Sequence, residues 1–175
     1  MKYFFEKYRK ILKNAVVRDY ESLVKLSKNE KPYCCALVTD SGAMSLFFAM
    51  NTKEKLIEKL QKVDNKYSAY YKWAPSEWTY GDHLSETKLV SKSSNVLSKK
   101  SEEKETKKEF SNFEEKLYET MTLVLKELVD ENIFDNMTVF ISISDDSRAR
   151  NVENYSAKLI NSETIYDEFM RRYEV

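Results

Sequence analysis

Two apolar runs on either side of a turn place the strongest constraint on the fold of this 175-residue chain. Tyr33–Thr39 and Ala43–Met50 are almost wholly apolar, and Asp40-Ser41-Gly42 between them is typical of a turn, with Gly42 able to adopt a positive φ. The pattern predicts a β-hairpin. Since neither run alternates with polar residues, we expect helices to cover both faces of this part of the sheet.

Several segments have apolar residues at every third or fourth position, the spacing of one face of a helix. Each such face needs a partner to bury it, and a sheet covered on two sides supplies one. We expect helices over residues 2–28, 51–66 and 110–132, a short helix at the start of residues 148–160, and a last helix that begins at Asn161 or Ser162.

Residues 137–144 alternate between apolar and polar side chains, with Phe140 as the exception, and predict a half-buried third strand. Together with the hairpin, this indicates the α+β class: a small antiparallel sheet with a β-hairpin, packed by several amphipathic helices. The length favours a single domain over residues 1–175. Residues 84–108 are rich in Ser, Lys and Glu, and we expect a mobile polar insertion with some helix there.

The low numbers of glycine, histidine and cysteine residues exclude several classes of binding site. The chain has two glycines, one histidine and two adjacent cysteines. A Gly-rich phosphate loop or dinucleotide turn needs several glycines, a multi-His metal site needs several histidines, and zinc ribbons need separated cysteine pairs. We therefore expect neither a cofactor nor a bound metal, and no catalytic residue is assigned.

The chain has no hydrophobic leader at its start and no stretch of about 20 apolar residues, so we expect a cytoplasmic protein without a membrane anchor. Its formal net charge is zero, which argues against nucleic-acid binding through a global field. The charge is uneven, however, since residues 1–30 are basic and residues 135–175 acidic. Solvated helix faces and a charged docking patch both remain open interpretations.

The most unusual segment is residues 67–80, in which six of fourteen residues are Tyr or Trp, including both tryptophans of the chain. Aromatic side chains bury a large area and keep a polar group, so they serve cores and interfaces equally well. Trp73 and Trp78 either anchor a loop on the sheet or line an exposed groove for a partner or ligand. The candidate binding residues are Tyr71, Trp73, Glu77, Trp78, Tyr80 and Asp145.

Carboxylates near these rings offer a second kind of chemistry. Glu77 lies between the two tryptophans, where burial would raise its pKa and suit it to acid or base work. Asp145 and Asp146 follow the third strand and suit either a divalent cation or a turn. Structural roles compete in each case, because carboxylates also accept hydrogen bonds from loop N–H groups.

Two further residue types carry weaker signals. Cys34 and Cys35 lie within one strand and point to opposite faces, so we expect packing rather than a mutual disulfide. His83 follows the aromatic segment without a Cys/His or Ser/His/Asp pattern to support catalysis.

Motifs along nearly the whole chain match one known pattern, and the Trp-x-Pro-x-Glu-Trp element and the Ser-Asp strand end are its most specific parts. The chain resembles the bacterial family catalogued as domain of unknown function 4303. One departure is Asp135, which follows Phe134 where family members often carry Gly. The matching motifs are Tyr33-x-x-Ala36-Leu37-x-Thr39-Asp40, Asn51-Thr52 with Leu56, Tyr71-Lys72-Trp73-x-Pro75-x-Glu77-Trp78, Thr138-x-Phe140-x-Ser142-x-Ser144-Asp145, Ser156-x-Lys158-Leu159-x-Asn161 and Phe169.

The resemblance implies an immunity protein that binds and neutralises a polymorphic toxin domain, because members look like small cytosolic proteins encoded near toxin and immunity genes. We therefore expect a protein-binding module, monomeric or homodimeric, that is not an enzyme. The alternative is a small-ligand-binding protein or enzyme that uses Glu77, Asp145 or Asp146 in an aromatic-lined pocket. A purely structural homo-oligomer is the third possibility.

Overall fold

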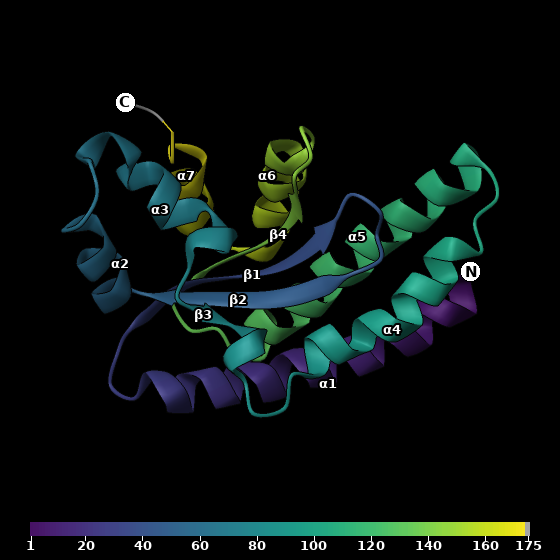
Figure 1. Ribbon diagram of the computed structural model, residues 1–175, viewed down its shortest axis with the longest axis horizontal. Coiled ribbons are helices and arrows are strands. Elements are labelled where there is room, and N and C mark those ends of the chain that lie inside the picture. Colours follow the sequence, from purple (N-terminus) through teal and green to yellow (C-terminus); the bar gives the residue numbers. More distant parts are fainter. Residues whose placement is uncertain (174–175) are drawn as a thin grey trace.

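The computed structural model describes residues 1–173, which form a four-stranded sheet between layers of helices (Figure 1). The strand order is β3-β2-β1-β4. β1 pairs antiparallel with β2, β2 pairs antiparallel with β3, and β1 pairs in parallel with β4. The strands are β1 (Pro32–Asp40), β2 (Leu46–Thr52), β3 (Tyr80–Gly81) and β4 (Thr138–Ser144).

The expected α+β class and the hairpin of β1 and β2 are confirmed. The sheet is mixed rather than strictly antiparallel, because β4 runs in the same direction as β1. A parallel neighbour requires a long crossover, and here the helices between β2 and β4 provide it. Local sequence patterns do not encode this long-range pairing.

From Cys34 to Val38, residues of β1 alternate between two cores, which explains why the run shows no polar face. Cys35 and Leu37 pack into the larger core, on one side of the sheet. Tyr33, Cys34 and Ala36 pack into the smaller core on the other side. The expectation that the sheet is covered on both faces is confirmed.

The helices divide between the two faces (Figure 1). One face is covered by α1, α4 and α5, and the opposite face by α2, α3 and α7, while α6 packs along β4 and also contacts α5. None of the helices in residues 1–173 is both long and apolar enough to cross a membrane. The helices are α1 (Lys2–Ser27), α2 (Lys53–Leu60), α3 (Ser68–Trp73), α4 (Leu89–Glu102), α5 (Lys107–Asp130), α6 (Ala149–Ile160) and α7 (Glu163–Met170).

The Ser/Lys-rich stretch 84–108 contains α4, which packs against α1. Val90 and Leu97 are fully buried in the larger core. The carboxylate of Asp19 on α1 accepts hydrogen bonds from the first backbone N–H groups of α4, those of Leu89 (3.1 Å) and Val90 (2.8 Å). A cap supplied by another helix fixes where α4 begins. The mobility expected for this stretch stays a prediction.

Candidate functional site

Both tryptophans of the aromatic segment, residues 67–80, lie in the smaller core. The ring centroid of Trp73 is 5.2 Å from that of Phe169 on α7, and Trp78 is 5.9 Å from Phe140 on β4. Both contacts are edge-to-face, a geometry that adds stability beyond the area buried. The tryptophans therefore anchor this segment on the sheet, which is one of the two roles considered for them, and Trp73 also lines a surface hollow with Leu56 and Lys72.

Two hydrogen bonds to the backbone carbonyl of Lys72 hold the segment in place. The carbonyl oxygen of Lys72 accepts from the Tyr33 hydroxyl at 2.7 Å and from Nε1 of Trp78 at 3.1 Å. Asn51 Nδ2 in turn donates to the Tyr33 hydroxyl at 3.2 Å. Burial raises the pKa of Tyr33 far above its ordinary value, so this hydroxyl stays protonated and able to donate.

The other candidates in the segment also have partners within the chain. The Tyr80 hydroxyl donates to Glu30 at 2.8 Å, and burial, with that carboxylate, raises the pKa of Tyr80 to about 12. Glu77 lies 3.4 Å from Nζ of Lys59, and the same ammonium sits 4.7 Å from the centroid of the half-buried Tyr71 ring. These contacts join the segment to α2 and to the base of β1.

The structure does not bring Glu77 and Asp145 together. Glu77 comes three residues before Tyr80 of β3, which lies across the sheet from Cys35 of β1. Asp145 comes directly after Ser144 of β4, which pairs with Asp40 at the other end of β1. Five strand residues, about 16 Å, separate Cys35 from Asp40. Asp145 is exposed, with a positive φ of 53°, in the turn after β4. Within residues 1–173, no three His, Cys, Asp or Glu side chains are grouped to hold a metal ion.

The two cysteines and the histidine were the weaker candidates from the sequence. Cys34 and Cys35 are free thiols buried in the two different cores, and burial raises the pKa of both. Their packing role matches the expectation. His83 is exposed in a short turn of helix after β3.

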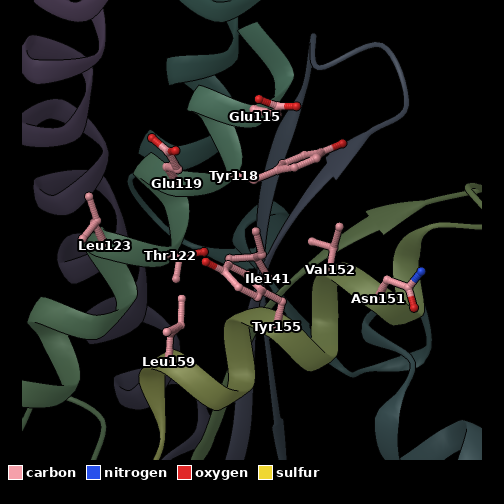
Figure 2. A pocket seen from close by; sticks show the side chains of 10 residues that line it. All are labelled: Glu115, Tyr118, Glu119, Thr122, Leu123, Ile141, Asn151, Val152, Tyr155 and Leu159. Atoms are coloured by element: carbon pink, nitrogen blue, oxygen red, sulfur yellow. The ribbon is translucent and has the colours of Figure 1, made fainter. Parts of the chain in front are cut away.

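A groove between α5 and α6 is the site that sequence reasoning missed (Figure 2). Its volume is about 620 Å³, within the range of binding pockets. Side chains of the two helices face each other across Ile141 of β4, which lies at the bottom. The lining residues are Glu115, Tyr118, Glu119, Thr122 and Leu123 from α5, Ile141 from β4, and Asn151, Val152, Tyr155 and Leu159 from α6.

Large apolar side chains stand open to solvent along this groove. Tyr155 is 68% exposed, Leu123 46% and Leu159 44%. Single exposed apolar residues are ordinary on a protein surface, but a contiguous set around a hollow is typical of a binding site.

A network of ion pairs lies beside Tyr118, one of the lining residues of the groove. Arg148 binds the buried carboxylate of Glu114 with two hydrogen bonds of 2.7 Å, and it also bonds Asp146. The Tyr118 hydroxyl donates to the same Glu114 at 2.7 Å. Arg148 lowers the pKa of Asp146 to about 2, mainly through these hydrogen bonds. The network ties the turn after β4 to α5 and fixes the Tyr118 ring.

Two side chains, one on α6 and one directly after it, form hydrogen bonds with the backbone at the outer edge of β4. The Asn161 side chain accepts from the Val139 N–H at 2.8 Å and donates to the Val139 carbonyl at 2.7 Å. The Ser156 hydroxyl accepts from the Ile141 N–H at 3.0 Å. Asn161 and Ser156, both noted as motif residues, thus satisfy backbone groups that an edge strand otherwise leaves free.

The signal for the groove is present in the sequence, but it is weak. Tyr155 and Leu159 are four residues apart on α6 and lie outside its buried face, which includes Ala157 and Ile160. Leu123 likewise adds an apolar side chain beside the core-facing positions of α5. These residues give each helix a second apolar surface beside its buried face, and no other element of the described chain covers it.

Comparison with known proteins gives one match. No curated protein and no solved structure matches this chain. The model of a family described as "Domain of unknown function (DUF4303)" matches residues 12–162, a span that includes the aromatic segment, the Ser-Asp end of β4 and the groove. The chain therefore belongs to the DUF4303 family.

Proposed function

We propose that this protein is a cytoplasmic protein-binding module whose α5–α6 groove docks a protein partner, and that it acts as an immunity protein that neutralises a toxin. The observation that carries the docking proposal is the open apolar groove with Tyr155, Leu123 and Leu159 exposed along it. Aromatic and aliphatic anchors in a hollow surrounded by polar groups are typical of interface hot spots.

The proposed mechanism is occlusion. A toxin bound by this groove would have its active cleft or substrate surface covered by the neighbouring face of the module. The aromatic segment has a different part in this proposal: it holds α2, α3 and α7 against the sheet. An aromatic-lined pocket that joins Glu77 and Asp145 has less support, since the two lie at opposite ends of the sheet.

The test is co-expression with the toxin-like product of an adjacent gene, read out by cell growth and by co-elution on size-exclusion chromatography. We expect the native chain to restore growth and to form a complex. The double variant Tyr155→Ala/Leu159→Ala removes two groove anchors, and we expect it to lose both protection and co-elution.

A matched control exists on α1. Tyr3 is as exposed as Tyr155, and Leu26 is 49% exposed, close to Leu159. The variant Tyr3→Ala/Leu26→Ala therefore removes the same side chains from another surface and should keep full protection. Continued killing by the toxin with the native chain, or equal protection by both variants, would contradict the proposal for this groove.

A further inference from the structure

The groove carries an excess of negative charge. Among its ten lining residues, Glu115 and Glu119 are charged and none is Lys or Arg. Lys116 pairs with Glu119 at 2.6 Å, whereas Glu115 has no ion pair within residues 1–173. Beside Tyr118, the two carboxylates of Glu114 and Asp146 share one guanidinium, which leaves a further negative charge. A partner that fits this site is basic beside its apolar contact.

The floor of the groove does not accept a β-strand. Asn161 occupies both the N–H and the carbonyl of Val139, and Ser156 occupies the N–H of Ile141. Addition of a strand requires free backbone groups at a sheet edge. An occupant must therefore be held through side chains.

The walls suit a helix of two to three turns. On α5 the lining runs from Glu115 to Leu123, and on α6 from Asn151 to Leu159, each about 12 Å long. Apolar side chains spaced three and four residues apart on a third helix would lie along this trough, as in other helix-in-groove complexes.

A second copy of the chain fits this face poorly. A two-fold contact would bring the same patch of each copy together, so Glu115 and Glu119 of both copies would lie within one interface. Like charges held close across an interface oppose association.

We propose that the groove binds an amphipathic helix of the partner protein, with apolar side chains toward Ile141 and lysines or arginines beside Glu115 and Glu119. This inference rests on the proposed function and specifies the chemistry of its partner.

The first experiment uses three fluorescently labelled peptides of about fifteen residues and the full chain, with fluorescence anisotropy as the readout. One peptide is an amphipathic helix with leucines on one face and lysines beside them. In the second, glutamates replace the lysines, and in the third a central proline breaks the helix. We expect only the lysine peptide to bind, with affinity that falls as salt rises. Equal binding of the glutamate peptide or of the proline peptide would overturn the basic or the helical part of the inference.

The second experiment reverses the groove charges. Glu115→Lys/Glu119→Lys should weaken binding of the lysine peptide by about tenfold and strengthen binding of the glutamate peptide. The control Glu6→Lys/Glu21→Lys makes the same change of net charge on exposed positions of α1 and should leave both affinities unchanged. Binding that follows net charge alone, equal in both variants, would overturn the assignment to the groove.

The cognate complex separates this inference from the proposed function. Loss of the toxin complex in Tyr155→Ala/Leu159→Ala, with no loss in Glu115→Lys/Glu119→Lys, would keep the docking function and overturn the basic helix. Retention of the complex in both variants would overturn both proposals. A concentration-dependent dimer that the Tyr155→Ala/Leu159→Ala variant dissolves would identify a second copy as the occupant and overturn the inference.

Discussion

The aromatic segment and the α5–α6 groove use similar side chains for opposite purposes. Trp73 in the segment is 4% exposed, whereas Tyr155 in the groove is 68% exposed. The segment concentrates its rings within fourteen residues, yet the tryptophans meet Phe140 and Phe169 inside the molecule. The groove collects its apolar residues from three separate elements, and no local run of sequence marks it.

The difference shows that aromatic density along a chain does not measure exposure. A large ring lowers the free energy of the folded state most when it is buried, so a segment rich in rings is first drawn to the core. An interface residue has to stay outside a core that is already complete. Tyr155 satisfies this condition because Ala157 and Ile160 of the same helix supply the buried face.

The largest expected effect tests the structural half of this comparison. Trp73→Ala removes a buried ring that contacts Phe169, and we expect it to lower the free energy of unfolding by about 3–5 kcal/mol. Tyr155→Ala, at the exposed end of the comparison, should change it by about 0.5 kcal/mol or less. Urea denaturation measures both. A small loss in Trp73→Ala, similar to that in Tyr155→Ala, would break the comparison.

Much of the fold can be predicted from local patterns. The hairpin follows from two apolar runs around Asp40-Ser41-Gly42, and β4 from the alternation over residues 137–144. The alternation was wrong about exposure, because Thr138 and Ser142 on the polar face of β4 are buried as well. The parallel partnership of β1 and β4 does not follow, because about a hundred residues separate the two strands and no local signal encodes which edge β4 joins.

The site was less predictable, for a physical reason. Whether Trp73 is buried depends on Phe169, a residue almost a hundred positions later, so the composition of residues 67–80 could not decide between anchor and interface. The groove depends on how far apart α5 and α6 lie, which is set by the packing of both helices against β4. Only an apolar residue outside the buried face of each helix, such as Leu123 or Tyr155, hinted at it.

A second prediction addresses the floor of the groove. Asn161→Ala leaves the N–H and carbonyl of Val139 without their partner, so we expect a loss of about 1–3 kcal/mol in the free energy of unfolding. Hydrogen exchange at Val139 should become faster than in the native chain. Asn161→Asp keeps the acceptor for the Val139 N–H and should slow that exchange relative to Asn161→Ala. Unchanged exchange in Asn161→Ala would show that the side chain does not protect this edge.

The smallest expected effect concerns the ion pairs beside the groove. Arg148 lowers the pKa of Asp146 to about 2 from an ordinary value of 3.8, so the unfolded chain binds more protons than the folded chain between these values. Stability therefore rises with pH across this range, and the contribution, about 1 kcal/mol or less, is fully present above pH 3.8 and lost as pH falls through 2.

The measurement is urea denaturation of the native chain and of Asp146→Asn at several values between pH 2 and pH 5. The advantage of the native chain should shrink steadily toward the acid end. Asp145→Asn is the control. The Asp145 side chain is exposed, and the positive φ of this residue suits asparagine equally well. A pH-independent difference between the native chain and Asp146→Asn would mean that Arg148 holds Glu114 alone. In that case Asp146 adds little to the negative charge beside the groove. The negative charge of the groove would then come mainly from Glu115 and Glu119 on α5.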